Sequence, residues 1–251
     1  WMLVGFIHGV MNTDNMSIVS ETIDYGPCAF MDTFKPNRVF SSIDRNGRYA
    51  WDQQANIAVW NLSRLAETLL PLLDLETESG VKVLEEQLAE FIPKFNFTLR
   101  QGMLKKFGFY QPADKHLEFT SDSLTMLSEQ KIDFTLFFNY LTNLQKGDDD
   151  EPLLELFTER DKGIAWLNKW RHLKSDNPEI RIAMRRANPV FIARNHQVEK
   201  AIRAAEDNGD FSLFKRLAKS LANPFEVSPD NEEFQSPPLP EEIVTQTFCG
   251  T

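Results

Sequence analysis

Apolar side chains recur at spacings near three and four over most of the chain after residue 50, and this pattern constrains the fold most. The first run is expected to form the buried stripe of a helix and comprises Ile57, Trp60, Leu62, Leu65, Leu69 and Leu72. Comparable runs continue as far as Leu221. The sequence therefore predicts a mainly α-helical domain over residues 51–222.

Capping residues and prolines predict where individual helices begin. Asp133 is a suitable N-cap, and Pro152 suits the first turn of the next helix. Asn177 with Pro178 and Asn188 with Pro189 each indicate a further helix start.

The first 50 residues differ, because they are rich in glycine, proline and polar side chains. We expect a small β-hairpin formed by residues 16–18 and 22–24, followed by a long ordered loop over residues 25–50. Loops of this length are uncommon in compact domains unless they carry function. Residues 1–50 are therefore the predicted catalytic and metal-binding region.

Residues 223–251 form the third predicted region, a proline-rich acidic tail that ends near Cys249. This segment has five prolines, six carboxylates and no Lys or Arg, so we expect no long helix in it. The whole chain has a net charge of -10, which argues against a nucleic-acid partner. No apolar run approaches the ~20 residues that cross a membrane, so no membrane association is expected.

Two short motifs in the first region carry the chemistry. Asp14 stands beside Asn15, and Asp24 begins an Asp-Tyr-Gly triplet after eight intervening residues. Mg²⁺ prefers hard oxygen ligands and takes only one or two from protein when phosphates supply the rest. Asn15 and Asp24 are therefore the candidate metal ligands, and Asp14 is the candidate proton acceptor for an attacking hydroxyl.

The spacing resembles that of protein kinases, with one departure. Asn15 lies seven residues after His8, as in the kinase catalytic loop, but the position two after His8 is Val10 instead of the catalytic aspartate. Valine cannot accept a proton. Asp14 is the only carboxylate in the loop, so it is the candidate for this role. We expect His8 to orient the loop and not to act as a base.

The longer strings are more specific and resemble the selenoprotein O family, also called the YdiU family. Residues 7–18 read IHGVMNTDNMSI, residues 22–27 read TIDYGP, residues 53–62 read QQANIAVWNL and residues 184–189 read MRRANP. The resemblance implies a protein-kinase-like C-terminal lobe with a helical extension. It also implies transfer of AMP from ATP, with Mg²⁺ or alternatively Mn²⁺, to Ser, Thr or Tyr hydroxyls of partner proteins.

Site roles follow by motif. Asp14 would accept the proton, Asn15 and Asp24 would bind the metal, and Asp24 would also lie against the nucleotide phosphates. Cys249 is third from the end, where some family members carry selenocysteine, so we expect redox exchange with Cys28.

Two cysteines are too few for a disulfide scaffold and suit a reducing compartment. We expect a cytoplasmic protein if bacterial and a mitochondrial one if eukaryotic.

The family's ATP-binding lysine and glycine-rich loop precede the catalytic loop, and the 11 glycines here contain no Gly-x-Gly-x-x-Gly. Because the chain begins with Trp1, we expect a piece of a longer protein that is inactive alone.

Two other functions stay open on the residues. The same metal ligands serve a kinase that transfers the γ-phosphate, and the missing kinase-type acid is compatible with a non-catalytic pseudokinase scaffold.

Overall fold

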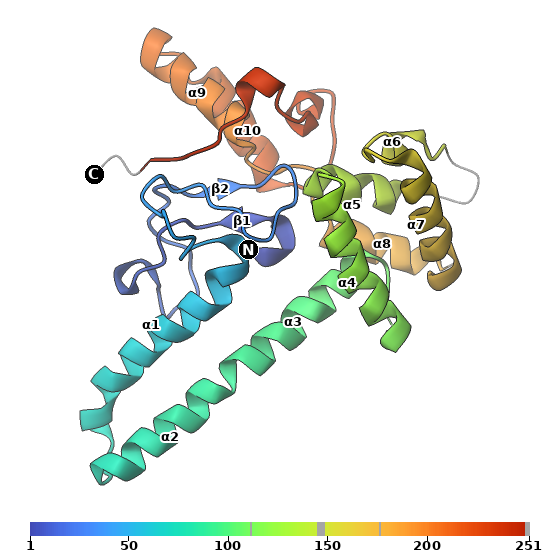
Figure 1. The fold of residues 1–251 in the computed structure, drawn as a ribbon. Helices are drawn as coiled ribbons and strands as arrows, with labels where there is room; N and C mark the ends of the chain where they lie inside the picture. Colours follow the sequence, from blue (N-terminus) through green and yellow to red (C-terminus); the bar gives the residue numbers. More distant parts are fainter. Residues whose placement is uncertain (111, 145–148, 176, 249–251) are drawn as a thin grey trace. The chain divides into compact units, whose positions relative to one another are not determined.

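The computed structural model describes residues 1–110, 112–144, 149–175 and 177–248 (Figure 1). It divides into two compact units. Unit 1 comprises residues 1–6, 29–35 and 101–245. Unit 2 comprises residues 7–28, 36–100 and 246–251. Each unit is therefore assembled from three separate stretches of the chain.

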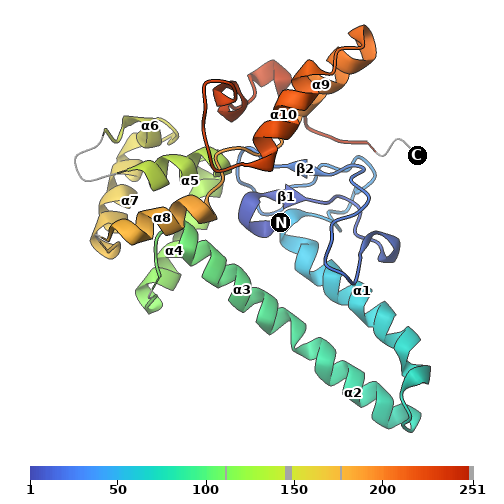
Figure 2. The same cartoon turned by 180° about the vertical axis from the view of Figure 1, so that it is seen from behind.

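Unit 2 is built on helix α1. Its elements are η2 (Thr13–Asn15), η3 (Trp51–Gln53), α1 (Gln54–Leu69), η4 (Leu70–Leu72), α2 (Thr77–Ala89) and the first part of α3 (Phe91–Lys106). Helix α2 follows α1 through η4 and contacts both (Figure 2). Residues 7–28 and 36–50 are loops apart from η2 and the second residue of β1 (Phe6–Ile7), so this unit displays long loops on a helical support.

The buried face of α1 differs from the stripe that the spacing predicts. The buried side chains are Gln54, Ile57, Ala58 and Asn61, which recur at intervals of three and four. Trp60 is 41% exposed, Leu65 37% and Leu69 39%, so their predicted burial is wrong. The buried face instead packs on the loop, where Met11 forms a core cluster with Ile57 and Ala58.

A small two-stranded antiparallel sheet is present, but the hairpin over residues 16–24 is not. Strand β1 pairs with β2 (Ala29–Phe30), and the Met31 amide donates to the Gly5 carbonyl at 2.9 Å. Ser20 and Asp24 have φ values of 63° and 53°. Such left-handed residues interrupt an extended strand, which explains why residues 16–24 stay irregular.

Unit 1 is helical around an aromatic core. Its elements are η1 (Met2–Val4), β2, the end of α3, α4 (Asp114–Glu129), α5 (Phe134–Asn143), α6 (Glu151–Leu154), α7 (Arg160–Leu173), α8 (Pro178–Ala187), α9 (Asn195–Asn208), α10 (Ser212–Ala222), η5 (Glu232–Gln235) and η6 (Pro240–Glu242). The Phe107 ring lies edge-on to Phe138 with centroids 5.0 Å apart, and the Trp166 ring lies 5.1 Å from Phe137. Among the described helices, none is long and apolar enough to cross a membrane.

Local chemistry explains two helix starts and fails at a third. The Asp133 side chain accepts from the Leu136 amide at 2.8 Å, and Asn177 accepts from the Glu179 amide at 2.9 Å, so the predicted N-cap at Asp133 and the predicted helix start at Asn177 are confirmed. The predicted start at Asn188 is wrong, because α9 begins seven residues later, at Asn195. Asn188 is buried and donates to the carbonyl of Lys106 and the hydroxyl of Thr142, at 3.0 and 2.8 Å.

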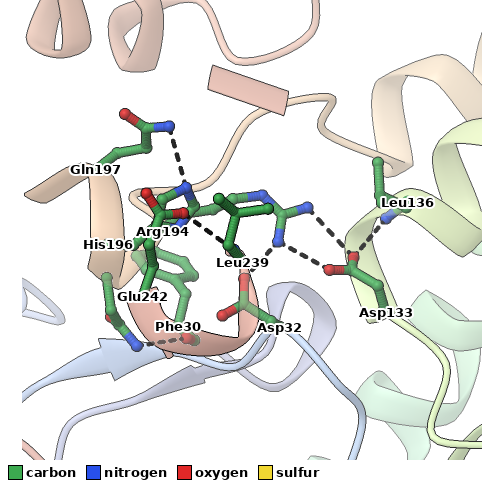
Figure 3. A network of polar contacts seen from close by, with 10 residues as sticks. Phe30, Asp32, Asp133, Leu136, Arg194, His196, Gln197, Leu239 and Glu242 are labelled. Carbon is green, nitrogen blue, oxygen red and sulfur yellow. Dashed lines mark hydrogen bonds and ion pairs between the residues drawn. The ribbon is translucent and has the colours of Figure 1, made fainter. Parts of the chain in front are cut away.

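A buried ion cluster holds three segments of unit 1 together (Figure 3). The guanidinium of Arg194, only 1% exposed, contacts the carboxylates of Asp32 and Asp133. One nitrogen lies 2.8 Å and the other 3.3 Å from Asp133. Burial alone would lower the pKa of Arg194, but the two carboxylates outweigh it and raise that pKa above its ordinary value.

Candidate active site

The loop from His8 to Asn15 is fixed to α1 by two amide side chains. Gln54 accepts a hydrogen bond from the His8 backbone amide at 3.1 Å. Asn61 donates to the Met11 carbonyl at 2.9 Å and to the Asn12 carbonyl at 3.4 Å. These bonds bridge 46 to 50 residues of sequence, so helix α1 determines the conformation of the loop.

The His8 side chain joins this loop to the segment that contains Asp24. His8 is fully buried, and its Nε2 donates to the Ile23 carbonyl at 2.8 Å. Beside it, Gly9 has a φ of 85°, and a Cβ there would lie 2.7 Å from the carbonyl oxygen of Pro27. Only glycine allows this close approach. The segments on both sides of Asp24 therefore pack on the start of the loop.

Asp14 and Asn15 lie in the single turn η2, where neither side chain is fully buried. Asp14 is exposed, with the Thr13 hydroxyl 3.5 Å from its Oδ1. The Asn15 Nδ2 donates to the carbonyl of Val10 at 3.0 Å, which leaves its Oδ1 to act as a ligand. Val10, at the position where kinases carry their acid, thus supplies a backbone carbonyl that orients Asn15.

Asp24 is exposed and has a positive φ of 53°. An aspartate in this conformation is uncommon, and such strain concentrates at functional positions. The described residues contain no group of three or more His, Cys, Asp or Glu side chains that would hold a metal. One carboxylate and one amide oxygen fit Mg²⁺ that takes its remaining ligands from phosphate and water, so Asp24 and Asn15 suit such an ion.

The comparison with protein families agrees with the resemblance in the motifs. The family model described as protein adenylyltransferase SelO matches residues 1–222. The chain belongs to the SelO family. Its relatives include proteins named protein nucleotidyltransferase YdiU from Shewanella denitrificans, 47% identical over 263 residues, and from Rhizobium johnstonii, 48% identical over 256 residues. A third, from Maridesulfovibrio salexigens, is 48% identical over 255 residues.

These matches cover 100% of this chain but only 51–52% of each relative. The SelO-family chain therefore spans about half the length of the curated relatives it matches.

Gln54 and Asn61 are the site residues that sequence reasoning missed in this SelO-family chain. Their signal is visible afterwards: two amides occupy the positions of an apolar stripe, three residues before Ile57 and three after Ala58. A buried amide needs hydrogen-bond partners, so such positions indicate that polar backbone lies opposite. The oxygens of Asn12 and Asn61 are buried without hydrogen-bond partners in the described structure.

The two candidate redox residues of the SelO-family chain are described unequally. Cys28 is half-buried, its thiol lies 3.6 Å from the Tyr25 carbonyl, and burial raises the pKa of the thiol. Cys249 lies outside the described residues. Two residues before it, Thr247 pairs with Ser41 in a parallel bridge and its hydroxyl donates to the carbonyl of Pro27.

Proposed function

We propose that the whole protein is a protein adenylyltransferase with a protein-kinase-like C-terminal lobe, which transfers AMP from ATP to Ser, Thr or Tyr hydroxyls of other proteins. The observation that carries the proposal is the position of the acid. Asp14 stands exposed next to Asn15, while Val10 gives only its carbonyl to the Asn15 amide. Membership of the SelO family and the nucleotidyltransferase names of the relatives support nucleotidyl transfer.

In the proposed reaction the acceptor hydroxyl attacks the α-phosphorus of ATP. The new O–P bond forms as the bond between the α-phosphorus and the bridging oxygen breaks, and pyrophosphate leaves. Asp14 takes the hydroxyl proton, and its exposure lets a protein side chain reach it. Asn15 and Asp24 would hold Mg²⁺, which neutralises charge on the phosphate oxygens when bound.

Labelling with two forms of ATP tests the proposal in the full-length protein. With α-³²P-ATP we expect label on proteins, and with γ-³²P-ATP we expect none, because the γ-phosphate leaves in pyrophosphate. Label from the γ form alone would instead establish a kinase. Residues 1–251 by themselves are predicted to be inactive, and micromolar affinity for Mg·ATP in calorimetry would contradict the associated expectation of weak binding.

The scaffold alternative makes a different prediction. If the protein is a non-catalytic pseudokinase, it transfers no label itself, and Asp14→Asn will behave as wild type does. If Asp14 is the proton acceptor, this variant loses labelling while it retains Mg·ATP binding, since Asp14 is not proposed to be a metal ligand.

We also propose a redox link between the tail and the segment after Asp24. Thr247 holds the tail against Pro27, next to Cys28, which supports exchange between Cys28 and Cys249. Formation of the disulfide needs an oxidant that accepts two electrons and two protons, such as a peroxide. Mass spectrometry after thiol trapping would detect the cross-link. Unchanged redox dependence of activity in Cys249→Ser would contradict the link.

A further inference from the structure

A pocket opens beside the candidate proton acceptor, entirely within unit 2. It has a volume of about 330 Å³ and lies between the loop and the outer face of α1. Thr13 and Met16, which flank Asp14 and Asn15 in sequence, both line it. The pocket is therefore within reach of a chain segment whose hydroxyl approaches Asp14.

The wall of the pocket is mostly apolar, although it lies in the exposed part of the unit. Its apolar side chains include Met16, Ile18, Leu62 and Leu65. Ile18 is 82% exposed and Leu65 is 37% exposed. Isolated exposed apolar residues are common, but here they share one concave surface with polar groups, which is the composition of a binding site.

A buried amide side chain lines the pocket on the side of the loop. Asn61 lines the pocket and is only 6% exposed, and its Oδ1 has no hydrogen-bond partner in the described structure. Its Nδ2 is already used on the loop carbonyls. The Asn61 amide therefore holds the loop side of the pocket and is not a contact for a ligand.

Arg64 is the only charged residue in the lining, so the charge at the pocket is positive. Its side chain is 44% exposed, and its guanidinium lies 2.7 Å from the carboxylate of Glu67. A pair this exposed is weak and readily exchanges partners. The pocket therefore favours an apolar side chain beside an acidic one.

We propose that this pocket binds the acceptor segment of the protein substrate, an extended stretch with an apolar anchor and a neighbouring acidic residue. The anchor lies within a few residues of the hydroxyl that receives AMP. This proposal rests on the proposed function and adds its substrate class: unstructured or extended segments in which the hydroxyl is flanked by an apolar and an acidic residue.

The test uses the full-length protein, α-³²P-ATP and a synthetic peptide library with a central Ser, Thr or Tyr. Wild type should prefer an apolar residue at one flanking position by about tenfold, the usual value of a filled apolar pocket. Leu65→Asp should abolish that preference. The matched control is Leu69→Asp, one turn along α1 and 39% exposed but outside the pocket lining; it should keep the preference.

A second pair of variants tests the charge. Arg64→Glu should reverse the preference from acidic to basic flanking residues, while Lys82→Glu on α2 should not. Affinity for Mg·ATP, measured by calorimetry, should be unchanged in all four variants.

Three results would overturn the proposal: equal behaviour of Leu65→Asp and Leu69→Asp, no flanking preference in wild type, or loss of Mg·ATP binding in both Leu65→Asp and Arg64→Glu. The last would make the face a structural contact. If wild type transfers no α-label to any peptide or protein, the proposed function itself fails, and that failure appears without any mutation.

Discussion

The Arg194 cluster of unit 1 and the loop of unit 2 differ in the burial and the pairing of their charged side chains. Arg194 is 1% exposed and contacts two carboxylates, so all three charged groups have a partner of opposite sign within the fold (Figure 3). Asp14 and Asp24 are exposed, and no Lys, Arg or His in the described residues lies within ion-pair distance of either. Buried charges need a partner within the fold, whereas these two exposed acids have none there, which is compatible with the catalytic and metal-binding roles proposed for them.

Removal of the buried cation should have the largest effect on stability. Arg194→Met leaves Asp32 and Asp133 as uncompensated charges in the interior, and we expect a loss of about 3–5 kcal/mol in the free energy of unfolding. Urea denaturation followed by circular dichroism would measure it. Wild-type stability in this variant would show that water reaches the cluster, and the contrast between the two regions would then disappear.

Removal of an unpaired acid should leave stability intact and abolish chemistry. Asp24→Asn keeps a side chain that tolerates the positive φ but loses the metal-binding charge. We expect AMP transfer by the full-length protein to fall at least about 100-fold, in the range seen when a group that stabilises transition-state charge is deleted. The urea midpoint should not change. Retained transfer would exclude Asp24 from the metal site.

The sequence alone predicts the three residues of the candidate site, because their motifs are local. Asp14, Asn15 and Asp24 fall within eleven residues, and all three lie in unit 2. It was insufficient for what holds them. Gln54 and Asn61 reach the loop across 46 and 50 residues, and a periodicity counted along one helix contains no information about distant backbone carbonyls.

The same distinction between local and distant contacts explains which helix starts the sequence predicts correctly. Asp133 and Asn177 cap their own helices through amides two or three residues away, so their sequence context is enough. Asn188 has the same Asn-Pro signature, but its side chain bonds to Lys106 and Thr142, and the Val190 amide bonds to the Pro224 carbonyl at 2.7 Å. Because these groups form tertiary hydrogen bonds, they do not start a helix, and α9 begins only at Asn195.

Lys106 differs from both the paired Arg194 and the exposed acids, because it is buried without an acidic partner among the described residues. It is 2% exposed, its Nζ lies 4.2 Å from the Phe138 ring centroid, and burial lowers its pKa to about 7. Between pH 7 and its usual pKa near 10.5 the unfolded chain holds more protons at this position than the folded chain. Folding stability should therefore rise with pH through this window, by about 1.4 kcal/mol per pH unit near its middle.

Lys106→Met tests this without the ammonium. At pH 7 the variant should be more stable than wild type, and its advantage should shrink as the pH rises from 7.5 to 9.5. Urea titrations at four pH values would measure both. A constant difference between the two proteins would mean that Lys106 stays charged, held by the faces of Phe134 and Phe138.

The smallest effect should come from an exposed arginine that, like Arg194, contacts two carboxylates. Arg203 also contacts two carboxylates, with 2.8 Å to Glu199 and 3.0 Å to Glu206, but its side chain is 57% exposed. Water already solvates all three groups, so Arg203→Met leaves no buried charge behind. We expect its urea midpoint to match that of wild type, in low and high salt alike. Because both arginines lie in unit 1 and each holds two acids, a large loss at Arg203 would show that the number of ion pairs matters more than burial. A loss at Arg194 alone would attribute the stabilisation to the buried position.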